Sequence, residues 1–302
     1  MATPLKIVTP VTVTDSVLYA TDVPETDYAE WSAATTYTLG QRVIRTSTHK
    51  VYESAQGGNL NNVPEATPLF WIEVSPTNSW KMFDASSSSA TAKSNSISVT
   101  LRPGVVCNAL AVINLKGCLS VRVRVEDATY GTLYDQTTST APTPAASDWW
   151  SWFFGLKKAQ DQVVVLDFNH ILTADVLVDF TGGTDLSVGV LLVGQKLEIG
   201  TAIQYGASLG IQDYSRKETN EWGDTVLIKK AFAKKASFTL SIPNDQLDMT
   251  MNTLSDLRAT PCLWVGVDEY KSTTLFGFYR EFGVVVAYPT FSDCSLDLEE
   301  LV

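Results

Sequence analysis

The sequence is poor in charge, and above all in positive charge. Only 18% of its 302 residues are charged, and 33 acidic against 22 basic residues give a formal net charge of −11. A field of that sign repels phosphate backbones, so the composition argues against nucleic-acid binding. With 45% hydrophobic residues, the chain also has little charge to cover its surface, which favours an assembly that hides part of it.

Long apolar runs are missing as well. No stretch of 18 apolar residues occurs, so the sequence predicts no bilayer-spanning segment. The opening residues MATPLKIVTPVTVTD lack the charged and apolar regions of a secretion signal, which predicts assembly in the cytoplasm. The nearest approach to a basic patch is KKAFAKK at 229–235, and we therefore expect no membrane insertion.

Histidine and cysteine, two residue types that often carry catalysis or bind metals, are scarce. The two histidines, His49 and His170, stand apart in expected turns, and the four cysteines form no C-x-x-C pair. A structural zinc site needs two close pairs of ligands, and neither a nucleophile elbow nor a phosphate-binding loop is present. The cysteines are therefore expected to be reduced and mostly buried. The sequence predicts a protein that is not an enzyme, with no catalytic residue, metal site or cofactor.

Short runs of alternating apolar and polar residues are abundant instead. They follow one another through residues 77–195, separated by Gly, Asp or Asn, which is typical of an antiparallel sandwich. In SVRVRV (120–125) the valines are expected to face the core and the arginines to face water.

The pattern divides the chain into four parts. Residues 1–26 alternate Thr, Val and Pro, which predicts an extended arm at a sheet edge or in a linker. Residues 27–76 form a compact module, 77–195 the sandwich, and 196–302 a second β-rich domain with one helix near 244–259.

That helix is the only one the pattern indicates. Asn244 or Asp245 can cap its start, and Pro261 follows its end. Four apolar residues fall on one face: Leu247, Met251, Leu254 and Leu257. The predicted fold class is therefore mostly β, with a small aromatic-cored module, a sandwich and a second β-rich domain with one helix.

The module at 27–76 is built around aromatic residues. Its frame is Trp31, Tyr37, Gly40, Val43, Tyr52, Pro64 and Trp71. A unit this small has little aliphatic core, and large rings can supply it. The frame resembles the chitin-binding modules of the type 5/12 carbohydrate-binding family.

That resemblance implies contact with a sugar through exposed rings. Here it points to Trp31 or Tyr37, with Gln56, Asn59 and Asn61 as hydrogen-bonding groups. The segment SAQGGNLNN departs from the family by carrying no ring. The alternative is that the aromatic residues of the frame form the core of the module rather than a ligand platform.

The remaining segments carry a second resemblance. PTNSWKMFDASSSSAT, SISVTLRPG and NALAVINLKG resemble the opening of a galactose-binding-like (discoidin-type) β-sandwich. GASLGIQDYSRKETNEWGD, FTLSIPNDQLDMTMNTLSDLRATPCLWVG and FGFYREFGVVVAYPTFSDCSLDLEEL look like segments of tail proteins from long-tailed bacteriophages. In those proteins a small carbohydrate-binding-like module precedes sandwich domains.

This resemblance implies a structural virion protein of the phage tail, in the baseplate or tail tip, assembled in the host cytoplasm. Its expected partners are other tail and baseplate proteins, further copies of itself in a ring, and a host surface glycan. One alternative is an adhesin that attaches the virion to a host polysaccharide. Another is a tail-associated glycan hydrolase, which needs two carboxylates opposed across a cleft.

The most unusual stretch is DWWSWFFG at 148–155. As a strand it would be apolar on both faces, unlike a strand with one wet face. The favoured interpretation is that one face fills the sandwich and the other lies under the C-terminal domain. The second is that Trp150, Trp152 and Phe154 pack on a neighbouring subunit. A further candidate is a polar contact strip in an assembly, formed by Tyr214, Arg216, Lys217 and Glu218, with a solvated hairpin as the alternative.

Overall fold

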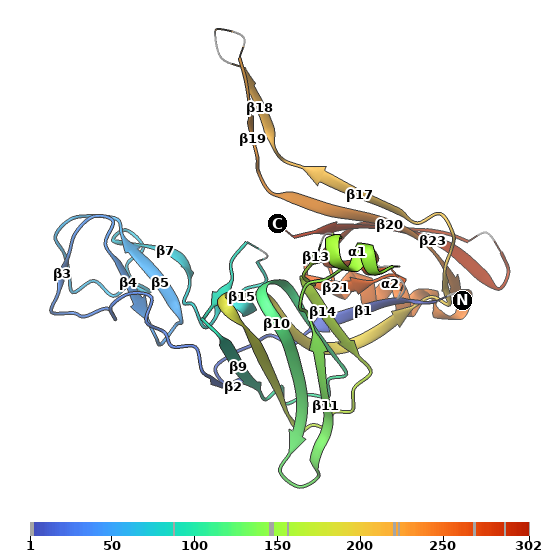
Figure 1. Cartoon of the computed structure of the whole chain (residues 1–302), viewed down its shortest axis with the longest axis horizontal. Coiled ribbons are helices and arrows are strands. Elements are labelled where there is room, and N and C mark those ends of the chain that lie inside the picture. The colour runs from blue at the N-terminus through green and yellow to red at the C-terminus, as the bar shows by residue number, and fades with distance from the viewer. Residues whose placement is uncertain are drawn as a thin grey trace.

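The computed structural model describes residues 3–86, 88–144, 148–155, 157–219, 222, 224–267, 270–286 and 288–301. The protein is mostly β, with 53% of residues in strands and 9% in helices, which confirms the predicted fold class. One antiparallel system of 14 strands forms the body. A small module lies beside this body, and a slender hairpin projects from the body (Figure 1).

The small module has a core of aromatic rings. Its strands are β3 (Thr36–Tyr37), β4 (Arg42–Arg45), β5 (Lys50–Ser54), β6 (Asn59–Leu60) and β7 (Trp71–Pro76). The side chains of Tyr37, Val43, Tyr52 and Trp71 are each at most 6% exposed. The rings of Tyr37 and Trp71 meet edge to face with centroids 5.1 Å apart, a favourable aromatic geometry.

Two long strands, β10 (Ala109–Asp127) and β15 (Asp175–Ile199), organise the middle of the chain and pair along most of their length. Around them lie β2 (Leu18–Thr21), η1 (Lys81–Phe83), β8 (Thr91–Ala92), β9 (Ser96–Leu101), β11 (Gly131–Ser139) and β14 (Gln162–Leu166). The valines of SVRVRV are at most 1% exposed. Arg122 pairs with Asp135 on the outer face at 2.6 Å, so the predicted alternation is confirmed.

A second core lies under the C-terminal strands. These elements are β16 (Ala202–Ile203), β20 (Phe232–Pro243), β21 (Cys262–Val265), η3 (Lys271–Thr273), β22 (Thr274–Val285) and β23 (Phe291–Glu300). Phe238, Trp264 and Leu296 are fully buried there. The indole Nε1 of Trp264 donates to the carbonyl of Gly277 at 3.0 Å, which satisfies its only polar group.

Strand β1 (Leu5–Pro10) joins the two cores. It pairs with β15 on one side and with β21 on the other, so the prediction of an edge or linker for this segment is wrong. Proline is tolerated because β21 pairs only with residues 6–8, and Pro10 lies beyond that ladder. The predicted domain boundary at 195/196 falls inside β15, which runs on to Ile199.

The predicted helix is present as η2 (Asn244–Gln246) followed by α2 (Leu247–Asp256). No side chain caps either element, so the predicted caps are wrong. The amide oxygen of Asn244 instead accepts a hydrogen bond from Ser292 Oγ at 2.6 Å. The predicted apolar face packs on the second core, except at Met251, which is 43% exposed.

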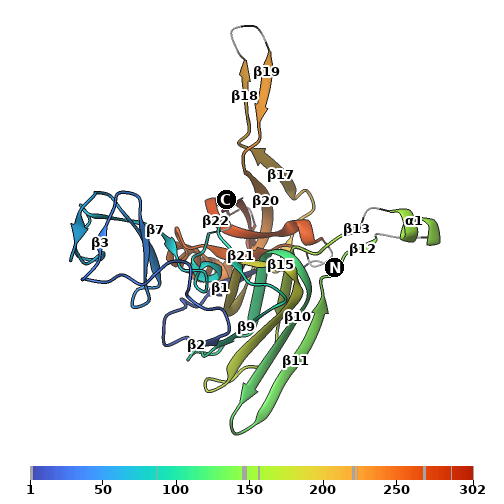
Figure 2. The ribbon, with the colours of Figure 1, turned by 60° about the vertical axis from the view of Figure 1, so that its left-hand side comes forward.

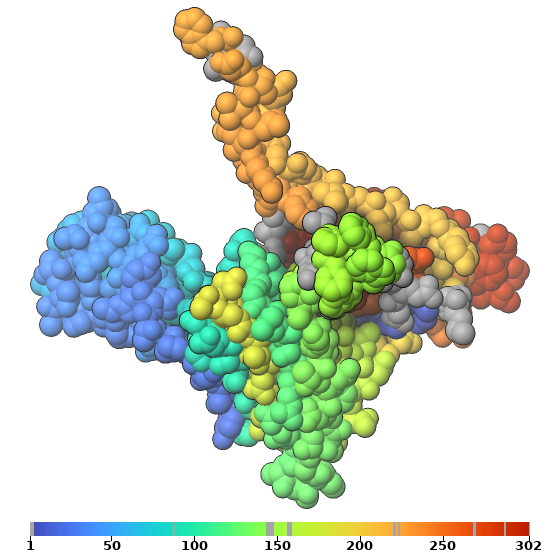
Figure 3. Space-filling model, in the orientation of Figure 1, coloured from blue at the N-terminus to red at the C-terminus, as the bar shows by residue number. Residues whose placement is uncertain are grey.

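Two projections leave the body in different directions (Figure 2). One is the hairpin of β18 (Arg216–Thr219) and β19 (Thr225–Ile228), which continues from β17 (Ser208–Asp213), a strand paired with β20 in the body. The other is a stalk of β12 (Thr143–Pro144) and β13 (Lys157–Lys158), which carries helix α1 (Trp149–Phe154). The small module and the end of the hairpin stand clear of the body in the space-filling view (Figure 3).

Candidate interaction surfaces

The stretch DWWSWFFG forms the short helix α1 instead of a strand. The Asp148 carboxylate accepts hydrogen bonds from the backbone N–H of Ser151 at 2.7 Å and from its hydroxyl at 3.2 Å. The backbone hydrogen bond keeps the pKa of Asp148 below its usual range. Gly155 ends the helix and donates to the carbonyl of Ser151 at 2.8 Å. These end signals outweigh the strand propensity of aromatic residues.

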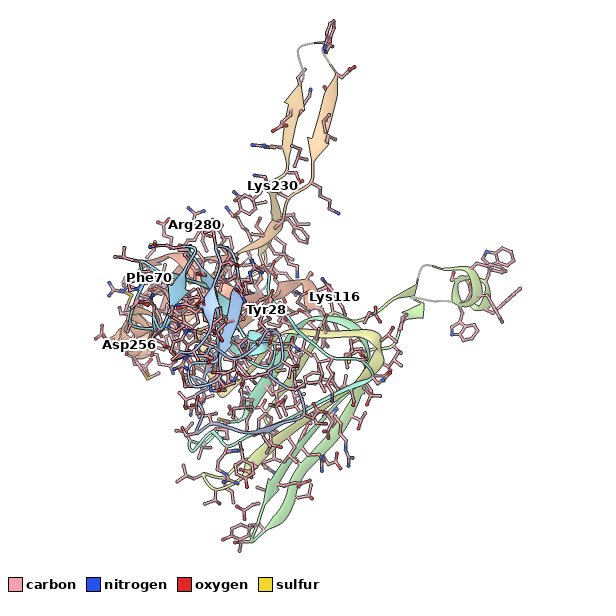
Figure 4. All side chains as sticks on the ribbon, turned by 90° about the vertical axis from the view of Figure 1, so that its left-hand side faces the viewer. Tyr28, Phe70, Lys116, Lys230, Asp256 and Arg280 are labelled. Atoms are coloured by element: carbon pink, nitrogen blue, oxygen red, sulfur yellow. The ribbon has the colours of Figure 1, made fainter. Side chains whose placement is uncertain are left out.

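All five rings of α1 are exposed. The exposed fractions lie between 53% and 69% for Trp149, Trp150, Trp152, Phe153 and Phe154. Figure 4 shows the helix and its side chains at the far end of the stalk, away from the body. The interpretation that this segment fills the sandwich is therefore wrong. Packing of Trp150, Trp152 and Phe154 on a neighbouring subunit stays a prediction, and the three side chains are exposed.

The exposed apolar surface of α1 is large. At these exposed fractions, five aromatic side chains leave about 600 Å² in contact with water. A typical soluble monomer has a largest apolar patch of about that size, and such patches mark interaction sites. Helix α1 is therefore a candidate interaction surface.

The rings of α1 do not form a flat platform. Trp149 and Trp150 meet at an interplanar angle of 83°, and Trp152 and Phe153 meet at 84°. Trp150 and Phe154 are tilted by 42°. Stacking on extended sugar faces needs coplanar rings, so this geometry argues against a glycan platform at α1.

The hairpin exposes a second apolar surface. Leu227 is 76% exposed and Val226 56%, and Trp222, in the loop between β18 and β19, is 89% exposed. Tyr214, the first residue of the predicted contact strip, donates its hydroxyl proton to Glu299 at 3.1 Å. Tyr214 therefore anchors the base of the hairpin to the sheet.

Arg216 forms an ion pair with Glu218, which lies on the same strand and belongs to the same predicted contact strip. The register of β18 with β19 places Val226 on the face that carries this ion pair and Leu227 on the opposite face. Both faces of the ribbon thus carry an exposed branched aliphatic side chain. An isolated two-stranded ribbon is marginally stable in water, and covering these faces would stabilise it.

Two of the five predicted sugar-contacting residues are buried. Tyr37 is 3% exposed, and its hydroxyl accepts the N–H of Ser32 at 2.7 Å. Asn59 is fully buried and donates to Ser54 Oγ at 2.9 Å and to Phe70 O at 3.2 Å. Neither side chain has a surface for a ligand, so these two predictions are wrong.

The other three predicted sugar-contacting residues do not form one cluster of free groups. Trp31 is half-buried, and the Arg45 guanidinium lies over its ring at 5.1 Å from the centroid. Gln56 and Asn61 are exposed, but the Gln56 amide donates to the carbonyl of Leu69 at 2.8 Å. Cation–π contact with Arg45 occupies the ring face that a sugar would need.

A cluster of side chains that the sequence does not predict connects the small module to the body. It consists of His49, Glu25, Asp15 and Trp80, and we call it the latch. The His49 ring contacts Glu25 at 2.7 Å and Asp15 at 3.1 Å, and it stacks on Trp80 at 4.2 Å between centroids. Trp80 also donates its indole proton to Glu25 at 3.2 Å. His49 lies in the predicted turn between β4 and β5. Because these residues are far apart in the chain, no sequence pattern indicates the latch.

His170 and the four cysteines are buried. His170 is 8% exposed, and its Nδ1 accepts the N–H of Cys107 at 3.3 Å. Burial lowers the pKa of His170 and raises that of Cys107 to about 11. All four cysteines are free and buried, as the sequence predicts.

The described residues hold no group of three or more His, Cys, Asp or Glu side chains that could bind a metal ion. Among the helices in that part of the chain, none is long and apolar enough to cross a membrane.

A hollow of about 510 Å³ lies on the outer face of the C-terminal sheet. It is lined by Ser208, Gly210, Lys235, Ala236, Ser237, Arg280, Glu281, Asp297 and Leu298. Arg280 and Lys235 both pair with Glu299 there.

Comparison with known proteins finds no matching family model, no matching curated protein and no matching solved structure.

Proposed function

We propose that this chain is a structural protein of a bacteriophage tail, in the baseplate or tail-tip region, and that it works by assembling with neighbouring subunits. The sequence resemblance to tail proteins supports the location in the virion. The observation that carries the assembly role is the β18–β19 hairpin, which exposes Val226 and Leu227 on opposite faces.

A projecting ribbon with this composition is suited to a protein neighbour. Burial of the two aliphatic side chains and of Trp222 would remove apolar surface from water on both faces of the ribbon. The hydrogen bond from Tyr214 to Glu299 fixes the base of the hairpin on the sheet, and the rest of the hairpin projects away from the body. A second copy is the simplest neighbour, because tail components are commonly arranged in cyclic rings.

The experiment is to measure the mass of the purified full chain by sedimentation over a range of concentrations. The wild type is expected to form a closed oligomer, and V226S/L227S is expected to shift that equilibrium towards monomer by at least about tenfold. Leu69→Ser is the matched control, because Leu69 is 79% exposed on the small module, against 76% for Leu227.

A wild-type chain that stays monomeric at high concentration, or a V226S/L227S variant that assembles like the wild type, would overturn the role of the hairpin. Mass spectrometry of purified phage particles tests the location separately. Absence of the chain from intact tails would refute it.

The glycan adhesin is not favoured by any arrangement of the described residues. Of the predicted contact groups, Tyr37 and Asn59 are buried, and the Trp31 ring is covered by Arg45. Incubation of the full chain with a glycan array tests this alternative, and specific binding that is lost on changing Gln56 and Asn61 would restore it.

A further inference from the structure

Helix α1 has the shape of an element that lies in a lipid surface. At 3.6 residues per turn, its five rings cover an arc of about 200° around the helix axis. Ser151 lies in the middle of the remaining arc, and its hydroxyl is hydrogen-bonded to Asp148. We propose that α1 inserts its rings into the interface of a lipid bilayer, with the Ser151 side towards water.

The width of the apolar arc distinguishes a helix that binds a bilayer from a helix that docks in a protein groove. A helix that docks on a protein usually presents a stripe about 100° wide, whereas the rings of α1 cover about twice that angle. Residues 149–155 contain no charge, and the adjacent Asp148 carboxylate lies on the Ser151 side of the helix, where it can stay in water. A fluid medium can surround rings that point in many directions, which suits an interfacial helix.

The composition also fits the depth at which such helices lie. Three of the five rings belong to tryptophan, and Trp149, Trp150 and Trp152 are each more than half exposed. The indole ring is apolar with one polar N–H, which places it at the boundary between headgroups and acyl chains. Asp148, at the start of the helix, holds the backbone N–H of Ser151, so this polar group is satisfied within the chain.

The stalk keeps the body from blocking the approach. Strands β12 and β13 carry α1 outward, and the views of Figures 2 and 4 agree that the helix lies beyond the body. The expectation from the sequence of no membrane insertion rested on the absence of a long apolar run and of a basic patch. A helix that lies in the interface needs no spanning length, and its apolar arc makes electrostatic attraction unnecessary.

The charge of the protein gives the proposal a specific signature. A formal net charge of −11 opposes approach to anionic lipids. Binding through the rings therefore predicts partition into neutral phosphatidylcholine vesicles that persists at 0.5 M salt, where electrostatic contacts are largely screened.

The experiment mixes the full chain with phosphatidylcholine vesicles, measures partition by flotation, and measures quenching of tryptophan fluorescence by lipids with brominated acyl chains. The wild type is expected to bind and to be quenched. W149S/W150S/F154S is expected to bind at least about 100-fold more weakly, since three large apolar side chains no longer leave water. The control is Y130S/Y205S, which removes two rings that are 72% and 106% exposed elsewhere, and it should bind like the wild type.

Three results would overturn the proposal: no partition of the wild type into neutral vesicles, binding only to anionic vesicles with release by salt, or unchanged binding of W149S/W150S/F154S. The first would leave a protein as the partner of α1. Lipid binding and assembly are tested by different residues, because V226S/L227S should still bind vesicles and W149S/W150S/F154S should still assemble.

Discussion

Replacement of the rings of α1 should leave the stability of the fold almost unchanged, whereas replacement of one buried ring should not. In W149S/W150S/F154S the three side chains that change are 59–69% exposed. Exposed substitutions usually alter the free energy of unfolding by at most about 0.5 kcal/mol each. We therefore expect a total change near 1 kcal/mol and a melting temperature within about 4 °C of the wild type.

Trp264→Leu provides the contrast within the same chain. Trp264 is fully buried, and its indole N–H satisfies the carbonyl of Gly277. A cavity remains around the smaller leucine and the Gly277 carbonyl loses its donor, which together cost about 3–5 kcal/mol. At about 2–4 °C per kcal/mol for a domain of 150–250 residues, the melting temperature should fall by roughly 6–20 °C.

Thermal unfolding of the full-length variants, followed by circular dichroism, separates these outcomes. Equal losses in W149S/W150S/F154S and Trp264→Leu would mean that the α1 rings pack against the body in solution. That result would refute the treatment of α1 as an exposed binding element and would remove the basis for its contact with lipid.

Three further outcomes follow from buried polar groups. Burial lowers the pKa of His170 from its ordinary value of 6.5. The contribution of His170 to folding stability is therefore fully present above about pH 6.5 and is lost as the pH falls below that value. Thermal melts at pH 7 and pH 5 should show a smaller loss of stability on acidification for His170→Gln than for the wild type. Burial raises the pKa of all four thiols. A thiol-reactive disulfide at pH 8 should therefore label no cysteine in the folded protein and all four in urea. Fast labelling of the folded chain would contradict the burial of the cysteines. Asn59→Ala leaves Ser54 and the Phe70 carbonyl without their amide partner and should destabilise the small module by about 1–3 kcal/mol. Limited proteolysis of the small module should then be faster than in the wild type. An unchanged rate of cleavage would argue against a structural role of Asn59.

Alternation made the strands predictable. The pattern of SVRVRV follows directly from the period of two in a β-strand, and the valines are at most 1% exposed. The aromatic core of the module was also predicted as one of two alternatives, since Tyr37 and Trp71 were read either as core or as ligand platform. For these residues burial is a local consequence of spacing and ring size.

The binding elements were harder to predict because local signals compete there. Six residues are too few to establish a helical period, and the rings of α1 favour a strand. Asp148 and Gly155 are the signals that identify the helix, and both are readable in the sequence. The latch around His49 gives no such signal, because its partners are brought together only by the fold.

The central position of β1 affects how the molecule forms. Residues 5–10 are made well before their two pairing partners, Gly194–Ile199 and Leu263–Val265. Until residue 265 has left the ribosome, this strand has an open hydrogen-bonding edge, and closure then depends on contacts between distant parts of the chain. Nascent chains that stop before that point would be prone to pairing with one another instead of with themselves.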